Sequence, residues 1–299
     1  MVKFSLSLFF KNLKYLGRLR LKDIHRLQDV VATKNELNDS LDNLVYELPS
    51  LLNRTQSVFR PIVKTDEETV NDLTVSDKSF IRFGDGEIMI MEGSGIIYQK
   101  YNEILSQRLK DVIKSNHSKL MIGINYYYYY ADLSNFLDFP KTFYRTSVNH
   151  LRMRQNKYLI PEKEYYSASI TQVYHTYKNY DCISFYMKMR EIWKQKKITI
   201  ICGNKTFEGI QYNIFDCAKS VDYIYGPWCN AFDRYEELLN KARQIDREKL
   251  IIIILGPTAK VLAYDLFLLG YRVLDLGHIA KDFDLVMKNT RKLDTFWLD

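Results

Sequence analysis

The sequence predicts a protein of the α/β class, with a doubly wound, mostly parallel sheet covered by helices on both faces. Short apolar runs alternate with stretches of helical periodicity from about residue 60 onward, and most of the apolar runs are followed by glycine or polar residues. Repeated strand and helix units of this kind build a parallel sheet. The expected arrangement is therefore Rossmann-like.

Apolar runs give the expected strands, and amphipathic stretches between them give the expected helices. Strands are expected at residues 80–83, 119–124, 167–171, 198–202, 221–225, 250–255 and 271–276. Helices are expected at residues 104–113, 183–192 and 258–269. In doubly wound sheets, ligands bind beyond the carboxyl ends of the strands. Functional residues are therefore expected at those ends.

An N-terminal helical extension, residues 1–55, differs in character from the main domain, residues 60–299. In residues 1–22, apolar side chains alternate with lysine and arginine, which predicts a basic helix suited to peripheral contact with an anionic membrane surface. Packing of this helix on the protein body or on another subunit is the alternative. Apolar residues between 24 and 48 recur at spacings of three, four and seven, as in a coiled coil. A homo-oligomer formed through these helices is therefore a hypothesis.

Composition limits the class of protein and its partners. The chain has 299 residues, 46% of them hydrophobic, which excludes a disordered chain. Its net charge of +7 suits an anionic partner such as a nucleotide or an acidic lipid surface. Nucleic acid is not expected, since no recognition motif for it is present. No apolar run reaches the roughly 18 residues of a membrane-spanning helix.

The cysteine pattern bears on metal sites and on location. The four cysteines form no C-x-x-C pair and have no histidines clustered with them, so neither a zinc site nor a disulfide framework is indicated. A reducing compartment is the simplest setting. We therefore expect a cytoplasmic protein, with the inner face of the membrane as a variant of that location.

The first expected strand ends in a turn that carries two carboxylates, Asp85 and Glu87, next to glycines. On extended backbone, residues i and i+2 point to one side, about 7 Å apart at Cα, so the two carboxylates would converge on one hard cation. The alternative is an acidic turn that caps the following segment.

Three later strand ends carry polar or glycine residues. Gly203 is followed by Asn204 and Lys205, and a second run ends in Gly256, Pro257 and Thr258 before a helix. The second pattern suits a diphosphate bound at a helix N-terminus, although it is no Walker A loop and a plain strand–helix joint remains open. The third end would bring His278 to the same rim, either as a functional group or as a structural one.

Two further segments are ambiguous. Asn230 follows the expected strand 221–225 and begins a helical pattern, so its alternative role is a helix N-cap. The tyrosine run 126–130 follows another strand. Its rings suit stacking on a sugar or a base, but a half-buried helix start is the favoured interpretation.

Several motifs together resemble the bacterial glycosyltransferases of the GT-D type. They are Arg82-Phe-Gly-Asp-Gly-Glu87, Gly256-Pro-Thr-Ala259 and Leu274-Asp-Leu-Gly-His278, and the similarity spans roughly residues 60–297. The family was formerly a domain of unknown function and includes glucosyltransferases that extend O-glycans on serine-rich-repeat adhesins. Cys202, Thr206 and Phe207 replace part of a family segment like V-E-G-x-x-S-R-x-G, and Ala280 replaces an aspartate.

The resemblance implies a site and a reaction. Asp85 and Glu87 would bind a divalent metal, Mn²⁺ or Mg²⁺, and the diphosphate of a nucleotide sugar, and Arg82 and Gly84 would shape this turn. The segment containing Asn230 also resembles the family, so Asn230 is expected at the donor site.

The expected function is metal-dependent transfer of glucose or a related hexose from a UDP-sugar. The acceptor would be a hydroxyl of a glycan on a glycoprotein or a surface polysaccharide. Lys205 and the backbone at Gly256, Pro257 and Thr258 would stabilise the leaving diphosphate. His278 or Asp282 would orient or deprotonate the acceptor hydroxyl. The alternatives are a catalytically inactive nucleotide- or glycan-binding subunit of a transferase complex and a metal-dependent nucleotide phosphohydrolase.

Overall fold

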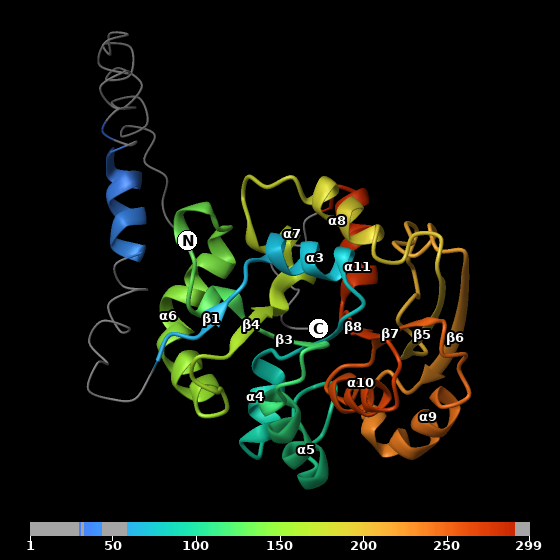
Figure 1. Cartoon of the computed structure of the whole chain (residues 1–299). Coiled ribbons are helices and arrows are strands. Elements are labelled where there is room, and N and C mark those ends of the chain that lie inside the picture. Colours follow the sequence, from blue (N-terminus) through green and yellow to red (C-terminus); the bar gives the residue numbers. More distant parts are fainter. Residues whose placement is uncertain (1–29, 31–32, 44–58, 291–299) are drawn as a thin grey trace, which may run out of the picture.

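One sheet of eight parallel strands runs through the protein (Figure 1). The computed structural model describes residue 30, residues 33–43 and residues 59–290. The strand order is β1-β4-β3-β2-β8-β7-β5-β6. The strands are β1 (Ile62–Val63), β2 (Ser79–Arg82), β3 (Leu120–Ile124), β4 (Glu164–Ser167), β5 (Lys197–Gly203), β6 (Ser220–Gly226), β7 (Leu250–Ile254) and β8 (Val273–Asp275). The predicted α/β class and parallel sheet are confirmed.

Helices cover both faces of this sheet, as Figure 1 shows. The α-helices within residues 59–290 are α3 (Asp66–Val75), α4 (Asp85–Met91), α5 (Glu103–Lys114), α6 (Asp138–Asn156), α7 (Val173–Thr176), α8 (Cys182–Arg190), α9 (Tyr235–Ala242), α10 (Thr258–Leu268) and α11 (Ile279–Met287). Helices α4, α5, α9 and α10 pack in one apolar cluster, and α3, α7, α8 and α11 pack in the other. This two-sided packing defines a doubly wound sheet.

The central strands are buried on both faces. In β7, Ile251 and Ile253 join the cluster on the α10 face, while Leu250 and Ile252 join the cluster on the α11 face. Alternation arises because successive side chains of a strand point to opposite faces. A continuous isoleucine run is therefore the expected sequence for a parallel strand covered twice.

Most predicted strands occur within three residues of their expected limits, with one clear exception. The expected strand at residues 167–171 is wrong, because β4 ends at Ser167 and a 3₁₀ turn, η4 (Ala168–Thr171), follows. The Ser167 hydroxyl accepts a hydrogen bond from the Ser169 N–H at 3.1 Å. This side-chain bond favours a turn over a continued strand.

The strand order reverses between β2 and β8. From β2 the chain proceeds to β3 on one side, whereas β8 is reached from β7 on the other side, and Phe80 pairs with Leu274 between them. In doubly wound sheets, the carboxyl ends of strands at such a reversal form the ligand crevice. The topology therefore points to the ends of β2 and β8.

Part of the N-terminal region is described, and residues 33–43 are helical. Asp42 forms ion pairs with Lys141 at 3.0 Å and with Arg145 at 2.8 Å, both on α6. Leu37 and Leu41 are exposed on this helix. The predicted membrane-surface segment 1–22 lies outside the described residues. Within the described part of the chain, no helix combines the length and apolar character needed to cross a bilayer.

Candidate active site

The acidic turn after β2 is helical rather than extended. Gly84 has extended backbone, and α4 begins at Asp85, so Glu87 stands in the first helical turn. The Gly84 N–H donates to Oε2 of Glu87 at 2.8 Å. A glutamate at this position reaches back to the residue before the helix and satisfies a backbone N–H that has no partner inside the helix. The predicted convergence of two carboxylates on extended backbone is therefore wrong, and the capping alternative holds for Glu87.

Lys260, in the first turn of α10, engages the other oxygen of Glu87. Its Nζ lies 3.1 Å from Oε1 of Glu87, 3.2 Å from Oδ2 of Asp275 and 3.2 Å from the carbonyl oxygen of Gly256. All three ionisable side chains are buried. An ammonium with three acceptors uses its full donor capacity, which offsets the loss of hydration. This ion pair network joins α4, α10 and β8.

Arg82 forms a second link between β2 and β8. Its backbone N–H donates to Oδ2 of Asp275 at 3.2 Å, and its Nε donates to the Asp275 carbonyl at 3.1 Å. Its Nη1 donates to Oγ1 of Thr171 and to the carbonyl of Ala168, at 2.7 and 2.9 Å. Gly277 has φ of 48°, and a Cβ there would overlap the Arg82 guanidinium. Arg82 therefore links the carboxyl ends of β2 and β8 and the η4 turn.

Asp85 is the more accessible of the two carboxylates in the turn. It is half-buried, and its Oδ1 accepts the Gly86 N–H at 3.0 Å. Burial, followed by the negative charge of Glu87, raises the pKa of Asp85 above its ordinary value. A bound cation would favour the ionised form and reverse this shift.

The residues of the turn fit a divalent metal in part. One carboxylate oxygen of Asp85 accepts a hydrogen bond from a backbone N–H. Carboxylate oxygens are suitable ligands for Mn²⁺ or Mg²⁺. Both oxygens of Glu87 are engaged, so its direct coordination requires the ion pair with Lys260 to open. Among the described residues, no three histidine, cysteine or acidic side chains gather as a metal-binding group.

His278 stands at the end of β8, directly before α11, and is exposed. Desolvation by the surrounding protein lowers the pKa of His278, while the charge of Asp282 opposes this shift. Asp282 itself is fully buried, with its Oδ1 3.3 Å from Nε2 of His175. His278 is therefore at the surface, whereas Asp282 is buried in α11.

The predicted diphosphate loop is only partly open. Gly256 is exposed and has φ of 53°, but Pro257 and Thr258 are buried. The Thr258 hydroxyl lies 3.4 Å from Oε1 of Gln99, whose segment covers the start of α10. Gly256 alone of these three residues is exposed. The N–H groups of Ala259 and Lys260 donate to the carbonyls of Gly256 and Pro257, at 3.1 and 3.3 Å, and the diphosphate role of the loop stays a prediction.

Lys205 and Asn230 lie at the carboxyl ends of β5 and β6. Lys205 is exposed, and its Nζ lies 5.0 Å from the centre of the Trp228 ring. Asn230 adopts a left-handed conformation and makes no side-chain cap. Its Oδ1 accepts the Lys100 N–H at 2.7 Å. Asn230 therefore fixes a loop, and neither residue contacts the acidic turn.

The tyrosine run forms a core element. Tyr127, Tyr128 and Tyr129 are buried, within and just after the 3₁₀ turn η2 (Tyr126–Tyr128). The structure thus agrees better with a half-buried helix start, the favoured interpretation of this run, than with stacking on a ligand. The Tyr127 ring packs edge to face on Tyr144 and Phe136.

Sequence patterns missed Lys260, Asp275 and His175 as members of the site. Lys260 had a usable signal, since it is a charged residue among the apolar residues that begin α10. His175 had none, because it meets Asp282 only through the packing of α7 near α11.

Comparisons with known proteins agree with the architecture. The family described as the glycosyltransferase GT-D fold matches residues 80–295. A probable glycosyl transferase, Gly, of Streptococcus gordonii is 30% identical over 220 residues, covering 73% of this chain and 32% of that protein. Glycosyltransferase GlyD of Streptococcus pneumoniae is 30% identical over 224 residues, covering 74% of this chain and 27% of that protein. The chain thus spans about a third or less of the length of these relatives.

Solved structures show the same fold. A structure described as a new glycosyltransferase from Streptococcus sanguinis superposes with a TM-score of 0.72 at 27% identity, covering 77% of this chain and 86% of the other. A second, described as a highly conserved domain of unknown function with a distinct glycosyltransferase fold, has a TM-score of 0.74 at 25% identity. The superposition covers 83% of this chain and 86% of the chain of that structure.

Proposed function

Because this chain belongs to the family of glycosyltransferases with the GT-D fold, we propose that it transfers a hexose from a UDP-sugar to a glycan hydroxyl. The acceptor glycan would belong to a glycoprotein or a surface polysaccharide. The observation that carries the proposal is the match of residues 80–295 to this family. Asp85 and His278, which follow the carboxyl ends of the adjacent strands β2 and β8, are the residues that we propose for the reaction.

Asp85 is the residue that would hold a divalent metal in this proposal. When bound, the ion would neutralise charge on the leaving diphosphate. Glu87 fixes the turn through Gly84 and Lys260, and Asp85 stands two residues before it in the first turn of α4. Gly256, which is exposed beside Lys260, is the part of its loop open to the donor.

His278 is the candidate base for the acceptor hydroxyl. Its lowered pKa keeps the imidazole neutral near pH 7, and a neutral imidazole can accept a proton. Asp282, buried beside it, stabilises the imidazolium that would form, as the opposing effect of its charge on the pKa indicates. We assign Asp282 to positioning, since it is fully buried.

The test measures UDP release from a panel of UDP-sugars, with and without acceptor and Mn²⁺. We expect Asp85→Ala to lower turnover about 100-fold or more, the loss typical of removing a group that stabilises developing charge. Asp77→Ala is the matched control, since Asp77 is an exposed acid of the loop before β2, paired with Lys119. Near-normal transfer by a folded Asp85→Ala protein would refute the role of Asp85.

A binding subunit without turnover is the second candidate. The ion pair between Lys260 and Glu87 favours it, because it leaves one carboxylate of the turn available rather than two. Calorimetry with UDP-sugars separates the two candidates. Donor binding without UDP release, across all donors and acceptors tried, would support the binding subunit.

A further inference from the structure

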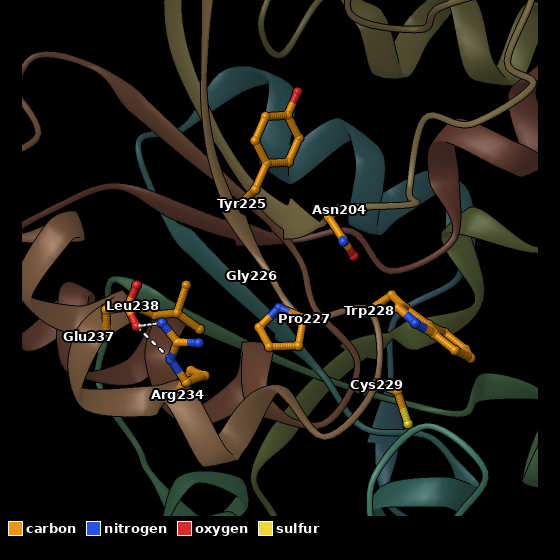
Figure 2. A pocket seen from close by; sticks show the side chains of 9 residues that line it. All are labelled: Asn204, Tyr225, Gly226, Pro227, Trp228, Cys229, Arg234, Glu237 and Leu238. Atoms are coloured by element: carbon orange, nitrogen blue, oxygen red, sulfur yellow. Dashed lines mark hydrogen bonds and ion pairs between the residues drawn. The ribbon is translucent and has the colours of Figure 1, made fainter.

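A cavity lies at the carboxyl ends of β5 and β6, three and four strand positions from β2 (Figure 2). Its volume is about 410 Å³, within the range of small-molecule sites. Side chains from the end of β5, from β6 and from the segment between β6 and α9 line it, together with the first turn of α9. Those used below are Asn204, Tyr225, Trp228, Arg234 and Glu237. Nothing in the proposed reaction uses these residues.

Exposed aromatic rings gather at this cavity. Trp228 is 51% exposed and Tyr225 is 55% exposed, and both line the cavity. Tyr98 packs edge to face against Trp228, with ring centroids 6.5 Å apart. Single exposed aromatic residues are ordinary, but a group of them around a hollow indicates a binding surface. Aromatic faces stack on the apolar faces of sugar rings.

The charged groups of the cavity neutralise each other. The Nε group of Arg234 donates a hydrogen bond to Oε2 of Glu237, on α9, at 2.6 Å. The remaining polar side chain among those named, Asn204, is a neutral amide that can both donate and accept. The charged groups of the lining itself are thus paired, which suits a ligand rich in hydroxyl groups. Lys205 is a neighbouring cation, with its Nζ 5.0 Å from the centre of the Trp228 ring.

A backbone contact links the wall of this cavity to the segment that follows α4. The Asn230 N–H donates to the Tyr98 carbonyl at 2.8 Å, which ties the loop after β6 to the segment that follows α4. Gly203 allows the loop after β6 to approach the end of β5, since a Cβ at Gly203 would lie 2.8 Å from Cα of Trp228. Strand β6 stands four positions from β2, about 19 Å at the usual strand spacing. A chain of sugar rings can cover that distance, whereas a single hexose cannot.

We propose that this cavity binds a neutral sugar ring of the acceptor glycan, at some distance from the hydroxyl that receives the hexose. This inference rests on the proposed function. The acceptor would then be an oligosaccharide, held by stacking on Trp228 and by hydrogen bonds to Asn204 and to the paired Arg234 and Glu237.

The experiment uses the whole protein and its variants Trp228→Ala and Asn204→Ala. A glycan array of neutral oligosaccharides identifies a bound probe, and calorimetry then measures the Kd of that probe and of UDP. We expect Trp228→Ala to weaken oligosaccharide binding about tenfold, with the Kd for UDP unchanged. Tyr212→Ala is the control, because Tyr212 is an exposed aromatic residue that does not line the cavity.

Transfer kinetics supply the second readout. Trp228→Ala should raise KM for the oligosaccharide acceptor and leave KM for the UDP-sugar unchanged. Weaker UDP binding with unchanged glycan binding would assign the cavity to the nucleobase and overturn the proposal, as would a wild-type protein that binds no glycan at millimolar concentration. Glycan binding that depends on Trp228 in a protein without transferase activity would support the cavity and refute the proposed function.

Discussion

Lys260 shows how one buried side chain sets the geometry of the acidic turn. Its ammonium holds Glu87 and Asp275 from two different strand–helix connections. The diphosphate loop was predicted from Gly256, Pro257 and Thr258, just before this lysine, whose own side chain is buried and pairs with the two carboxylates. The residue is therefore a positioning group of the site.

Replacing Lys260 should cost the protein much of its stability. In Lys260→Met, two buried carboxylates lose their cation, so we expect the free energy of unfolding to fall by about 3–5 kcal/mol. Urea denaturation measures it. Lys241→Met is the control, since Lys241 is an exposed partner of Glu237, and its cost should stay within about 1 kcal/mol. Equal effects of the two substitutions would contradict the network.

The lowered pKa of His278 predicts the pH dependence of transfer. A base must be neutral to accept a proton, so kcat/KM should fall as the pH drops through a pKa below about 6.5, the ordinary value for histidine. Near pH 7 and above, the His278 contribution should be constant. UDP release measured between pH 5 and pH 8 tests this. An acid limb that persists unchanged in a folded His278→Gln protein would assign the titration to another group.

At the scale of elements, α4 shows a limit of local pattern. The apolar run before Gly84 predicted β2 correctly, but the same extended geometry was carried on to Asp85 and Glu87. The helix starts there because the Glu87 side chain closes on Gly84, a contact between residues three apart that the G-x-x-E spacing does contain. The strand and the turn were predictable, whereas the partner of Glu87 on α10 was not.

The turn between β8 and α11 depends on the absence of a side chain at Gly277. We expect Gly277→Ala to displace Arg82 and lower transfer activity, because its Cβ would occupy the place of the guanidinium. Gly209→Ala is a matched control: Gly209 also has positive φ, at 73°, but no atom lies within 4 Å of its added Cβ.

Activity and denaturation measurements on both variants separate the effect of backbone strain from the effect of displacing Arg82. Backbone strain alone should destabilise each protein by roughly 1 kcal/mol. A larger loss in stability and activity is expected only for Gly277→Ala. Similar results for the two variants would mean that Arg82 can move without consequence.

At the scale of the whole molecule, the sheet was predictable and the assembled site was predictable only in outline. Strand–helix alternation and the buried isoleucine run of β7 indicate a parallel sheet from local sequence. The family motifs predicted that Asp85 and His278 lie at one edge of the sheet, and both residues follow the carboxyl ends of the adjacent strands β2 and β8. The contacts of Arg82 with Asp275 and of His175 with Asp282 depend on tertiary packing, and no local spacing encodes them.

The N-terminal helices remain the predicted route to a homo-oligomer. Leu37 and Leu41 are exposed on the helical segment 33–43, in which Asp42 pairs with Lys141 and Arg145 of α6. These two apolar side chains are left without cover among the described residues. We expect light scattering to give a multiple of the chain mass for the full protein and the mass of one chain after deletion of residues 1–55. An unchanged assembly state after the deletion would remove this hypothesis.

The adjacency of β2 and β8 has a consequence for synthesis of the protein. Arg82 and Asp275 are 193 residues apart in sequence, yet they share hydrogen bonds at the centre of the sheet. Contacts of such separation form late, because the entropy of closing a long loop must be overcome first. A ribosome that has made β2 through β7 therefore carries a chain whose Arg82 and Lys260 still lack Asp275. The centre of the sheet closes only when β8 has left the ribosome.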